Sequence, residues 1–286
     1  MIWLIGCRGM LGTELARLLE QQGHSFTGTD IECDITNPAA LGAFAARHAP
    51  KWIVNASAYT NVDQAENEEP RARAINAYGA GHIAAVAMAC GARIIHISTD
   101  YVFDGRSARP YLEDDSINPL GAYGRTKAAG EALVRAACPH HLILRTAWLY
   151  GRHGKNFVAT MLKLMAGRTT LNVVADQRGT PTWTHTLADV IARIITTATV
   201  PSGTYHVTDE GETTWHGFAV EIQRAAVARG LIPDHCAINP IPASQYPSKT
   251  PRPAYSVLSK ARIQAALDFR LPDWQSALAS HLDELL

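Results

Sequence analysis

The stretch Ile2-Trp-Leu-Ile-Gly6-Cys-Arg-Gly9-Met-Leu-Gly12 near the start of the chain decides the fold. The apolar run 2–5 is followed by a segment with a glycine at every third position, 6, 9 and 12. An amphipathic segment, 10–22, begins within this glycine segment. A strand that turns sharply into a helix needs a residue without a Cβ where the backbone approaches a pyrophosphate. The helix N-terminus then offers free N–H groups to the phosphates. Simple turn glycines are the alternative, but this position between strand and helix favours a dinucleotide phosphate loop.

Short apolar runs alternate with helix-length amphipathic segments through the first half of the chain. We expect strands at 2–5, 25–29, 52–56, 93–97 and 142–146. Helices are expected at 10–22, 38–48, 70–89 and 119–137, and the last three begin with a proline, which suits a first helical turn. This alternation predicts right-handed βαβ units, and so an α/β fold with a Rossmann-type, doubly wound parallel sheet.

The pattern is less regular after about residue 150. Helices are expected at 186–197 and 215–229, and a short strand at 205–208. Five of the 15 prolines lie within 240–253, which predicts an ordered binding loop or a connector there. We therefore expect two domains. A dinucleotide-binding Rossmann domain would span 1–150, with segments of about 176–208 packing back onto it, and a smaller substrate-binding domain would span 151–286.

Composition excludes several classes of function. The 286 residues carry 26 basic and 26 acidic side chains, and this balance argues against a nucleic-acid binder. No apolar run reaches about 18 residues, so we expect no membrane span. The first residues lack a basic leader and a small-residue cleavage site, which predicts a protein that begins at or near Met1. The five scattered cysteines form no Cys-x-x-Cys pair, so a reducing, cytoplasmic location is expected.

Two acidic residues follow the second expected strand. Asp30 lies 24 residues after Gly6, where a carboxylate can accept hydrogen bonds from the adenosine ribose. That carboxylate would repel a 2′-phosphate and favours NAD, whereas Arg8 in the glycine loop could pair with a 2′-phosphate and favours NADP. The choice between NADH and NADPH therefore stays open. Asp34 is placed to meet the adenine amino group, to cap the helix from Pro38, or to occupy a solvated turn.

A second set of residues can carry the chemistry. The fourth strand ends in Thr99-Asp100, and Tyr123 and Lys127 share one face of a later helix. A cation beside a phenol stabilises the phenolate and lowers the phenol's pKa, which suits proton transfer, and Thr99 would hold the substrate oxygen against Tyr123. Asp100 is equally well interpreted as a turn residue. The order of these motifs predicts carbonyl reduction with a nicotinamide coenzyme, although an exposed helical Tyr–Lys pair is the alternative.

The chain resembles the extended short-chain dehydrogenase/reductases, and within them most closely the dTDP-4-dehydrorhamnose reductase family. The matching segments follow the family order over nearly the whole length: 6–12, 54–63, 98–103, 123–127, 144–151, 156–157, 176–182 and 252–258. The sequence departs from the family pattern at Arg178, where an aromatic residue is usual, and at Tyr255, where an asparagine is usual. The resemblance implies that Thr99, Tyr123 and Lys127 form a catalytic triad.

The resemblance also implies binding residues. The coenzyme would contact the glycine loop, the residues after the second strand, those after the third strand and the Tyr–Lys pair: Gly6, Arg8, Gly9, Met10, Leu11, Gly12, Asp30, Asp34, Ile35, Ala58, Tyr59, Thr60, Tyr123 and Lys127. The nucleotide-sugar would contact Thr99, Asp100, Trp148, Asn156 and Arg252. An apolar indole face suits a sugar ring, although Trp148 could also be a core residue, and a guanidinium suits a diphosphate. Glu14 and Glu284 resemble positions that hold Mg²⁺ in family homodimers, or they are ordinary surface glutamates.

The activity that the resemblance implies is NAD(P)H-dependent reduction of the C4 ketone of dTDP-6-deoxy-L-lyxo-4-hexulose to dTDP-L-rhamnose. Another nucleotide-sugar 4-ketoreductase or a 4-epimerase is an alternative within the same fold. A reductase-like regulatory subunit that binds dinucleotide without catalysis is a second alternative. The complete set of Thr99, Tyr123 and Lys127 favours an enzyme, because a binding module has no need of it.

Overall fold

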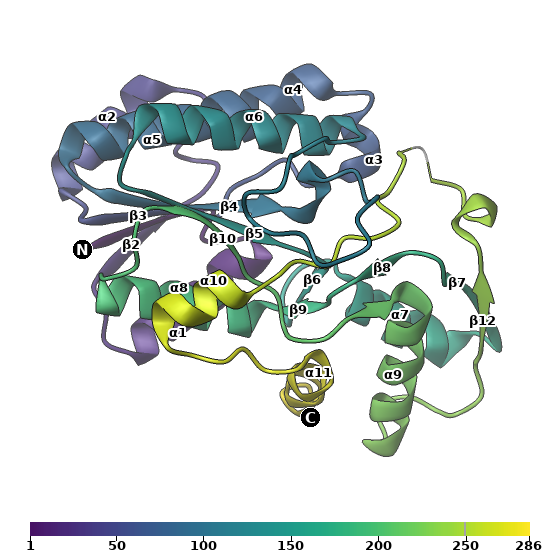
Figure 1. Ribbon diagram of the computed structural model, residues 1–286. Coiled ribbons are helices and arrows are strands. Elements are labelled where there is room, and N and C mark those ends of the chain that lie inside the picture. The colour runs from purple at the N-terminus through teal and green to yellow at the C-terminus, as the bar shows by residue number, and fades with distance from the viewer. Residues whose placement is uncertain (249) are drawn as a thin grey trace.

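A six-stranded parallel sheet forms the centre of the protein in this computed structural model, which describes residues 1–248 and 250–286 (Figure 1). The sheet has the order β10-β5-β4-β3-β1-β2. Its strands are β1 (Ile2–Ile5), β2 (Phe26–Thr29), β3 (Trp52–Asn55), β4 (Arg93–Thr99), β5 (His141–Thr146) and β10 (Gly203–His206). The direction of winding reverses between β1 and β3, and such a switch point is where open α/β sheets bind ligands at their carboxyl edge. The predicted doubly wound fold is confirmed.

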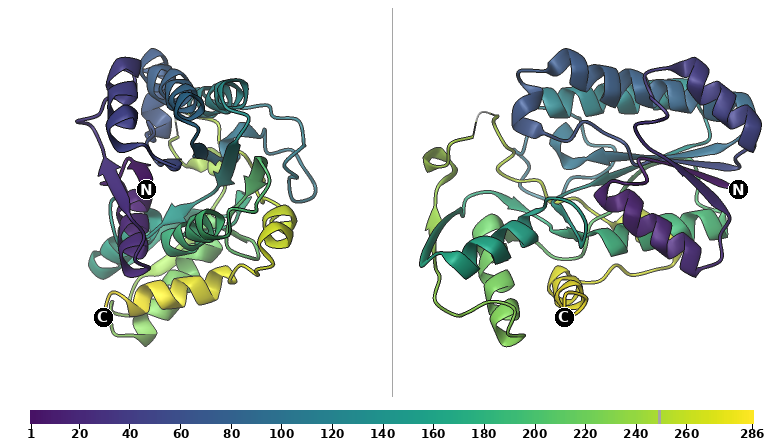
Figure 2. Two further views of the ribbon diagram at one scale, coloured as in Figure 1. Left: turned by 90° about the vertical axis from the view of Figure 1, so that its left-hand side faces the viewer. Right: turned by 180° about the vertical axis from the view of Figure 1, so that it is seen from behind.

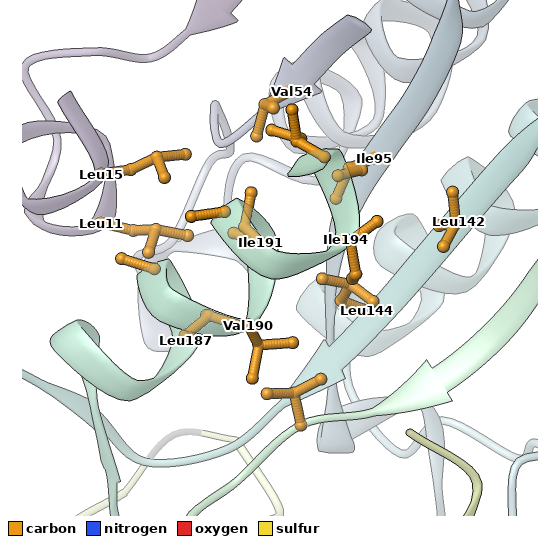
Figure 3. Packing of buried hydrophobic residues seen from close by; sticks show 14 of the residues in the cluster. Leu11, Leu15, Val54, Ile95, Leu142, Leu144, Leu187, Val190, Ile191 and Ile194 are labelled. Carbon is orange, nitrogen blue, oxygen red and sulfur yellow. The ribbon is translucent and has the colours of Figure 1, made fainter. Parts of the chain in front are cut away.

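Helices cover both faces of this sheet. One face carries α2 (Pro38–His48), α5 (Ala80–Cys90) and α6 (Ala122–Ala137), and the other carries α1 (Met10–Gln21) and α8 (Thr184–Thr197). Apolar residues of α8 at helical spacing meet Leu11 and Leu15 of α1 and the apolar face of the strands (Figure 3). Because these residues recur every three or four positions, the helices bury one continuous stripe each.

The expected helix 70–89 and the expected start at Pro119 both need correction. The first is divided into α4 (Glu69–Arg73), a π-helical segment (Ala74–Gly79) and α5. The widened turn contains Asn76, a buried residue whose side chain accepts a hydrogen bond from the Tyr59 amide at 2.8 Å and donates to the Tyr59 carbonyl at 3.1 Å. These contacts fix the loop after β3, and single π-turns of this kind are frequent at functional sites. The second helix, α6, begins only at Ala122, after Gly121 as its N-cap.

The second half of the chain contains more structure than its pattern indicates. Its helices are α7 (Phe157–Gly167), α8, α9 (Trp215–Ala228), α10 (Ala261–Leu267) and α11 (Trp274–Asp283), of which α8 and α9 were expected. The proline-rich stretch is not loop throughout, because β12 (Ala237–Ile241) pairs in parallel with β7 (Thr170–Val174) and includes Pro240. Pro240 is tolerated because a two-stranded sheet has only edge strands. Shorter elements are α3 (Val62–Ala65), β6 (Leu149–Tyr150), β8 (Arg178–Gly179), β9 (Thr182–Trp183), β11 (Thr213–Thr214) and 3₁₀ turns at Asp100–Val102 and Ala243–Gln245.

Besides the cluster that packs α2, α5 and α6 onto the sheet, two large hydrophobic clusters fill the interior. One lies between the sheet, α1 and α8, so that α8 and β10 pack with the first half of the chain. The other joins α7, α9 and α11 around Phe218, Trp274 and Leu278, away from the main sheet (Figure 2). The division into domains at residue 150 stays a prediction. Within the described residues, we find no helix long and apolar enough to cross a membrane.

A buried ion pair ties α6 to the sheet. Glu131 accepts hydrogen bonds from Nε and Nη2 of Arg145 on β5, each at 2.8 Å, and from the Ser98 hydroxyl on β4 at 2.6 Å. The side chains of Glu131 and Arg145 are 0% and 2% exposed. Burial raises the pKa of Glu131, but the hydrogen bonds and charge of Arg145 outweigh it and lower that pKa to about 2. The carboxylate is therefore ionised throughout the physiological range.

We predict that Glu131→Gln lowers the free energy of unfolding by about 3 kcal/mol or more, because it leaves the Arg145 charge buried without a counter-charge. Urea denaturation followed by circular dichroism measures this. The stabilisation by Glu131 is complete above its ordinary pKa near 4.5 and is lost as the pH falls towards 2.

Glu221→Gln is the matched control, since Glu221 pairs with Arg224, whose side chain is 70% exposed. It should change the free energy of unfolding by less than about 0.5 kcal/mol. Equal effects of the two variants would show that the buried pair does not hold α6.

Candidate active site

The glycine loop lies at the carboxyl end of β1, beside the end of β3. Gly6 has φ of +82°, and a Cβ there would lie 2.8 Å from the Ser57 amide nitrogen. A Cβ on Gly12 would lie 2.0 Å from the Gly6 carbonyl oxygen. Both positions therefore require glycine for the close approach of β1, α1 and the loop after β3. The side chain of Leu11 is buried in the core, so only its backbone faces the loop, whereas Met10 is half-buried.

The residues after β2 surround the tip of this loop. Asp30 accepts a hydrogen bond from the Arg8 amide at 3.0 Å, and the Arg8 guanidinium contacts Glu32, which was not predicted. Asp34 is exposed, and its Oδ1 accepts hydrogen bonds from the Thr36 amide and hydroxyl at 2.9 and 2.8 Å. The turn interpretation of Asp34 therefore holds, and its interpretation as a helix cap is wrong, because Asn37 caps α2.

The remaining coenzyme candidates differ in exposure. Ala58 and Tyr59 are half-buried and Thr60 is exposed in the loop after β3. The Tyr59 hydroxyl donates to Glu68 at 3.2 Å. Ile35 is 8% exposed and belongs to the hydrophobic cluster beneath α2 and α5, so its side chain contributes to the core.

The structure brings Thr99, Tyr123 and Lys127 to one end of the sheet. Thr99 ends β4, and the other two lie one turn apart at the start of α6. Lys127 Nζ donates to the Ile97 carbonyl at 2.6 Å, and burial lowers the pKa of Lys127 to about 8. Burial raises the pKa of Tyr123 to about 12, although a hydrogen bond with Thr99 acts to lower it. The expected lowering of the Tyr123 pKa by Lys127 is therefore wrong here, because burial dominates, and the phenol is protonated at neutral pH.

Asp100 is buried beside the hydroxyl of Thr99. That hydroxyl donates to Asp100 Oδ1 at 3.0 Å and accepts a hydrogen bond from the Tyr101 amide at 3.2 Å. Burial raises the pKa of Asp100 to about 6, while hydrogen bonds from Ser256 and Thr99 oppose the shift. Asp100 therefore orients the Thr99 hydroxyl in addition to starting a 3₁₀ turn.

Trp148 has an unusual conformation. Its φ is +48°, and its indole stacks on that of Trp215 with ring centroids 3.6 Å apart and planes 11° apart. A Cβ on Gly179 would lie 2.5 Å from the Trp148 ring. A non-glycine residue in the left-handed region is strained, and such strain is concentrated at functional sites. Trp215 was missed because its partner lies 67 residues earlier and no local pattern connects them.

A cavity of about 620 Å³ begins beside this stack. One side of α7, β7 and residues within 241–248 line it, together with Gln177, Trp215 and Arg252. Arg252 is at its edge, where Nη2 lies 3.5 Å from Asp63 Oδ2. The Nε of Arg252 has no hydrogen-bond partner among the described residues. Asn156 caps α7 by accepting from the Ala159 amide at 3.0 Å and donates to the Gly151 carbonyl at 2.7 Å, so its amide has a structural role.

The two departures from the family pattern contact one shared residue. Glu212 accepts a hydrogen bond from Arg178 Nη1 at 2.7 Å and another from the Tyr255 hydroxyl at 3.3 Å. These contacts connect β8, the residues before β11 and the segment that carries Ser256. The unusual residues therefore form a local cluster next to Gly179 and do not stand in isolation.

The proposed magnesium positions differ from expectation. Glu14 is 4% exposed and accepts hydrogen bonds from Arg17 at 2.5 Å and His185 at 2.8 Å, so its description as a surface glutamate is wrong. Burial opposes ionisation of Glu14, but these partners lower its pKa to about 2. Glu284 is exposed at the end of α11. Across residues 1–248 and 250–286, no cluster of three or more His, Cys, Asp or Glu side chains could hold a metal ion.

The parallel sheet with a glycine turn at its switch point defines a Rossmann-type protein, and a Tyr–Lys helix that starts at the same edge of the sheet, beside the end of β4, is typical of the short-chain dehydrogenase/reductase class. The family described as RmlD substrate binding domain matches residues 1–286. A dTDP-4-dehydrorhamnose reductase from Aggregatibacter actinomycetemcomitans is 41% identical, with 96% of each chain covered. The chain therefore belongs to the dTDP-4-dehydrorhamnose reductase family.

Two further similarities bear on substrate and coenzyme. A Streptomyces antibioticus protein named "Probable dTDP-4,6-dihydroxy-2-methyloxan-3-one 4-ketoreductase" is 42% identical over 100% of this chain and 96% of its own length. The crystal structure of dTDP-4-dehydrorhamnose reductase from Bacillus anthracis, in complex with NADP, has a TM-score of 0.93 and 33% identity. The match covers 99% of this chain and 98% of that one.

We predict that Gly179→Ala displaces the Trp148 indole, because the new methyl group would overlap the ring. The expected loss in free energy of unfolding is about 1–3 kcal/mol, with an altered near-UV circular dichroism signal from the stacked indoles. Gly42→Ala in α2 is the control, since its Cβ would meet nothing within 4 Å. An unchanged near-UV signal in Gly179→Ala would contradict this packing.

Proposed function

We propose that this protein uses NAD(P)H to reduce the C4 ketone of dTDP-4-dehydrorhamnose to dTDP-L-rhamnose. The observation that carries the proposal is the position of the half-buried Tyr123, whose phenol is protonated at neutral pH and lies beside Thr99 at the carboxyl edge of the sheet. A protonated group at this place can donate to a ketone oxygen. The names of the full-length relatives support the same reaction.

The glycine loop fits a dinucleotide. Gly6 and Gly12 allow β1, α1 and the loop after β3 to approach closely, and α1 begins at Met10, directly after this loop, so its first N–H groups are placed for a phosphate. The loop and helix would hold the diphosphate, Asp30 the adenosine ribose, and Lys127 the nicotinamide ribose. When bound, the reduced coenzyme supplies the hydride that adds to the sugar carbon.

The chain's own residues supply the proton and the orientation. As the carbonyl oxygen gains negative charge, the Tyr123 hydroxyl gives it a proton, so that the ketone becomes an alcohol. Thr99 would hold the same oxygen by turning its single O–H to it from Asp100 Oδ1, to which it donates in this structure. Lys127, with a pKa of about 8, remains protonated at neutral pH and stabilises the phenolate that is left.

The cavity beside Trp215 is the proposed place for the rest of the nucleotide-sugar. Trp148 would present its indole to the sugar ring, and Asn156 would define the cavity's edge by fixing α7. Among the residues that the structure describes, Arg252 Nε has no hydrogen-bond partner and Arg252 Nη2 makes a long contact with Asp63, so its guanidinium can pair with a diphosphate.

Reduction of a different dTDP-4-ketosugar is the second candidate. The 42% identical relative from Streptomyces antibioticus carries the name of such an enzyme. The Arg178–Glu212–Tyr255 cluster lies beside Gly179, where a change could alter the sugar pocket while the chemistry at Tyr123 stays the same. Turnover of both ketosugars under equal conditions distinguishes the two candidates.

We predict that Tyr123→Phe lowers kcat by about 10²–10⁴-fold, because the proton donor is lost. Its Kd for NADH should stay within about twofold, since the phenol's main task is proton transfer. Loss of absorbance of the reduced coenzyme with dTDP-4-dehydrorhamnose measures the rate. Tyr78→Phe, at a tyrosine that is 53% exposed, is the control. Full activity of Tyr123→Phe, or no turnover of any 4-ketosugar by the unmodified protein, would contradict the proposal.

A further inference from the structure

We infer that Glu32 directs this protein towards NADH, by adding a second negative charge beside Asp30 and by occupying the guanidinium of Arg8. The inference rests on the proposed function only in that a dinucleotide binds at the glycine loop. It concerns the site of the adenosine ribose, where NADH and NADPH differ by one 2′-phosphate.

The two carboxylates are fixed by backbone amides. Asp30 Oδ2 accepts from the Arg8 amide and Oδ1 from the Ile31 amide, each at 3.0 Å. Glu32 Oε1 accepts from the Asp30 amide at 2.7 Å, so the side chain folds back towards the end of β2. Hydrogen bonds from the backbone amides of Glu32 and Asp30 lower the pKa of Glu32, and the group is ionised at neutral pH.

The single cation of this cluster is already engaged. Arg8 Nη2 contacts Glu32, and its Nε lies 4.0 Å from Asp30 Oδ2. The glycine loop therefore presents its guanidinium to two carboxylates, and the three side chains carry a net charge of −1. Without Glu32, Arg8 and Asp30 would balance, and the guanidinium could turn to a phosphate as a bidentate donor.

The charge balance discriminates between the coenzymes. A ribose 2′-hydroxyl is neutral and can donate a hydrogen bond to Asp30. A 2′-phosphate carries about −1.5 to −2 charges at pH 7 and would enter a region of negative charge. At a separation of about 5 Å, even in a dielectric close to that of water, one extra carboxylate weakens binding of such a dianion by on the order of tenfold. Arg8 alone therefore does not make this an NADPH site.

The test measures Kd for NADH and NADPH by isothermal titration calorimetry at low ionic strength, with no sugar substrate present. The unmodified protein should bind NADH more tightly than NADPH. Glu32→Gln should tighten NADPH binding by on the order of tenfold and leave the Kd for NADH within about twofold. The double variant Arg8→Met/Glu32→Gln should lose the gain, and the gain of the single variant should shrink in 0.5 M salt.

Glu20→Gln removes one exposed negative charge elsewhere on α1 and serves as the control for net charge. It should leave both Kd values within about twofold. Tighter binding of NADPH than NADH by the unmodified protein, or an unchanged Kd ratio in Glu32→Gln, overturns the inference while the proposed reduction stands. Failure to bind either coenzyme overturns both, whereas normal binding with no ketosugar turnover overturns only the proposed reaction.

Discussion

The buried Glu131–Arg145 pair is the constraint on which the site depends. It joins α6 to β5 directly and to β4 through Ser98, so one carboxylate sets the distance between the helix and two strand ends. Lys127 lies one turn earlier on the same helix, and its contact with the Ile97 carbonyl extends the same attachment. An ion pair in the interior is costly to desolvate, but several hydrogen bonds with good geometry offset that cost. The result is a helix that cannot slide along the sheet.

Close backbone approach is the second constraint. Gly6 and Gly12 allow β1, α1 and the loop after β3 to meet where a dinucleotide fold places its phosphates. At the other end of the site, Gly179 makes room for the Trp148 indole, which keeps its strained backbone while it stacks on Trp215. The site thus lies between two places where side chains are excluded, and the packing there leaves little freedom for substitution.

Periodicity and turn chemistry predicted the elements well where a segment has one buried face. The predicted bounds 2–5 and 38–48 agree with β1 and α2, whereas the π-turn around Asn76 and the proline-containing β12 depend on tertiary contacts. The catalytic candidates could be found because they belong to a spaced motif. Their supporting partners could not, because Trp215 and Glu32 have no local signal. Glu131 is an exception: it continues the four-residue spacing of Tyr123 and Lys127, and that spacing could have identified it.

The central claim is that this arrangement delivers a proton from Tyr123 to a ketone whose carbon receives hydride from the coenzyme. The most direct measurement follows deuterium from NADH labelled on the transferred C4 position into the sugar, using NMR of the isolated product. We predict one deuterium at the sugar C4 for each coenzyme oxidised. A product without deuterium at C4, or an isomerised ketosugar with the label still in the coenzyme, would contradict the account.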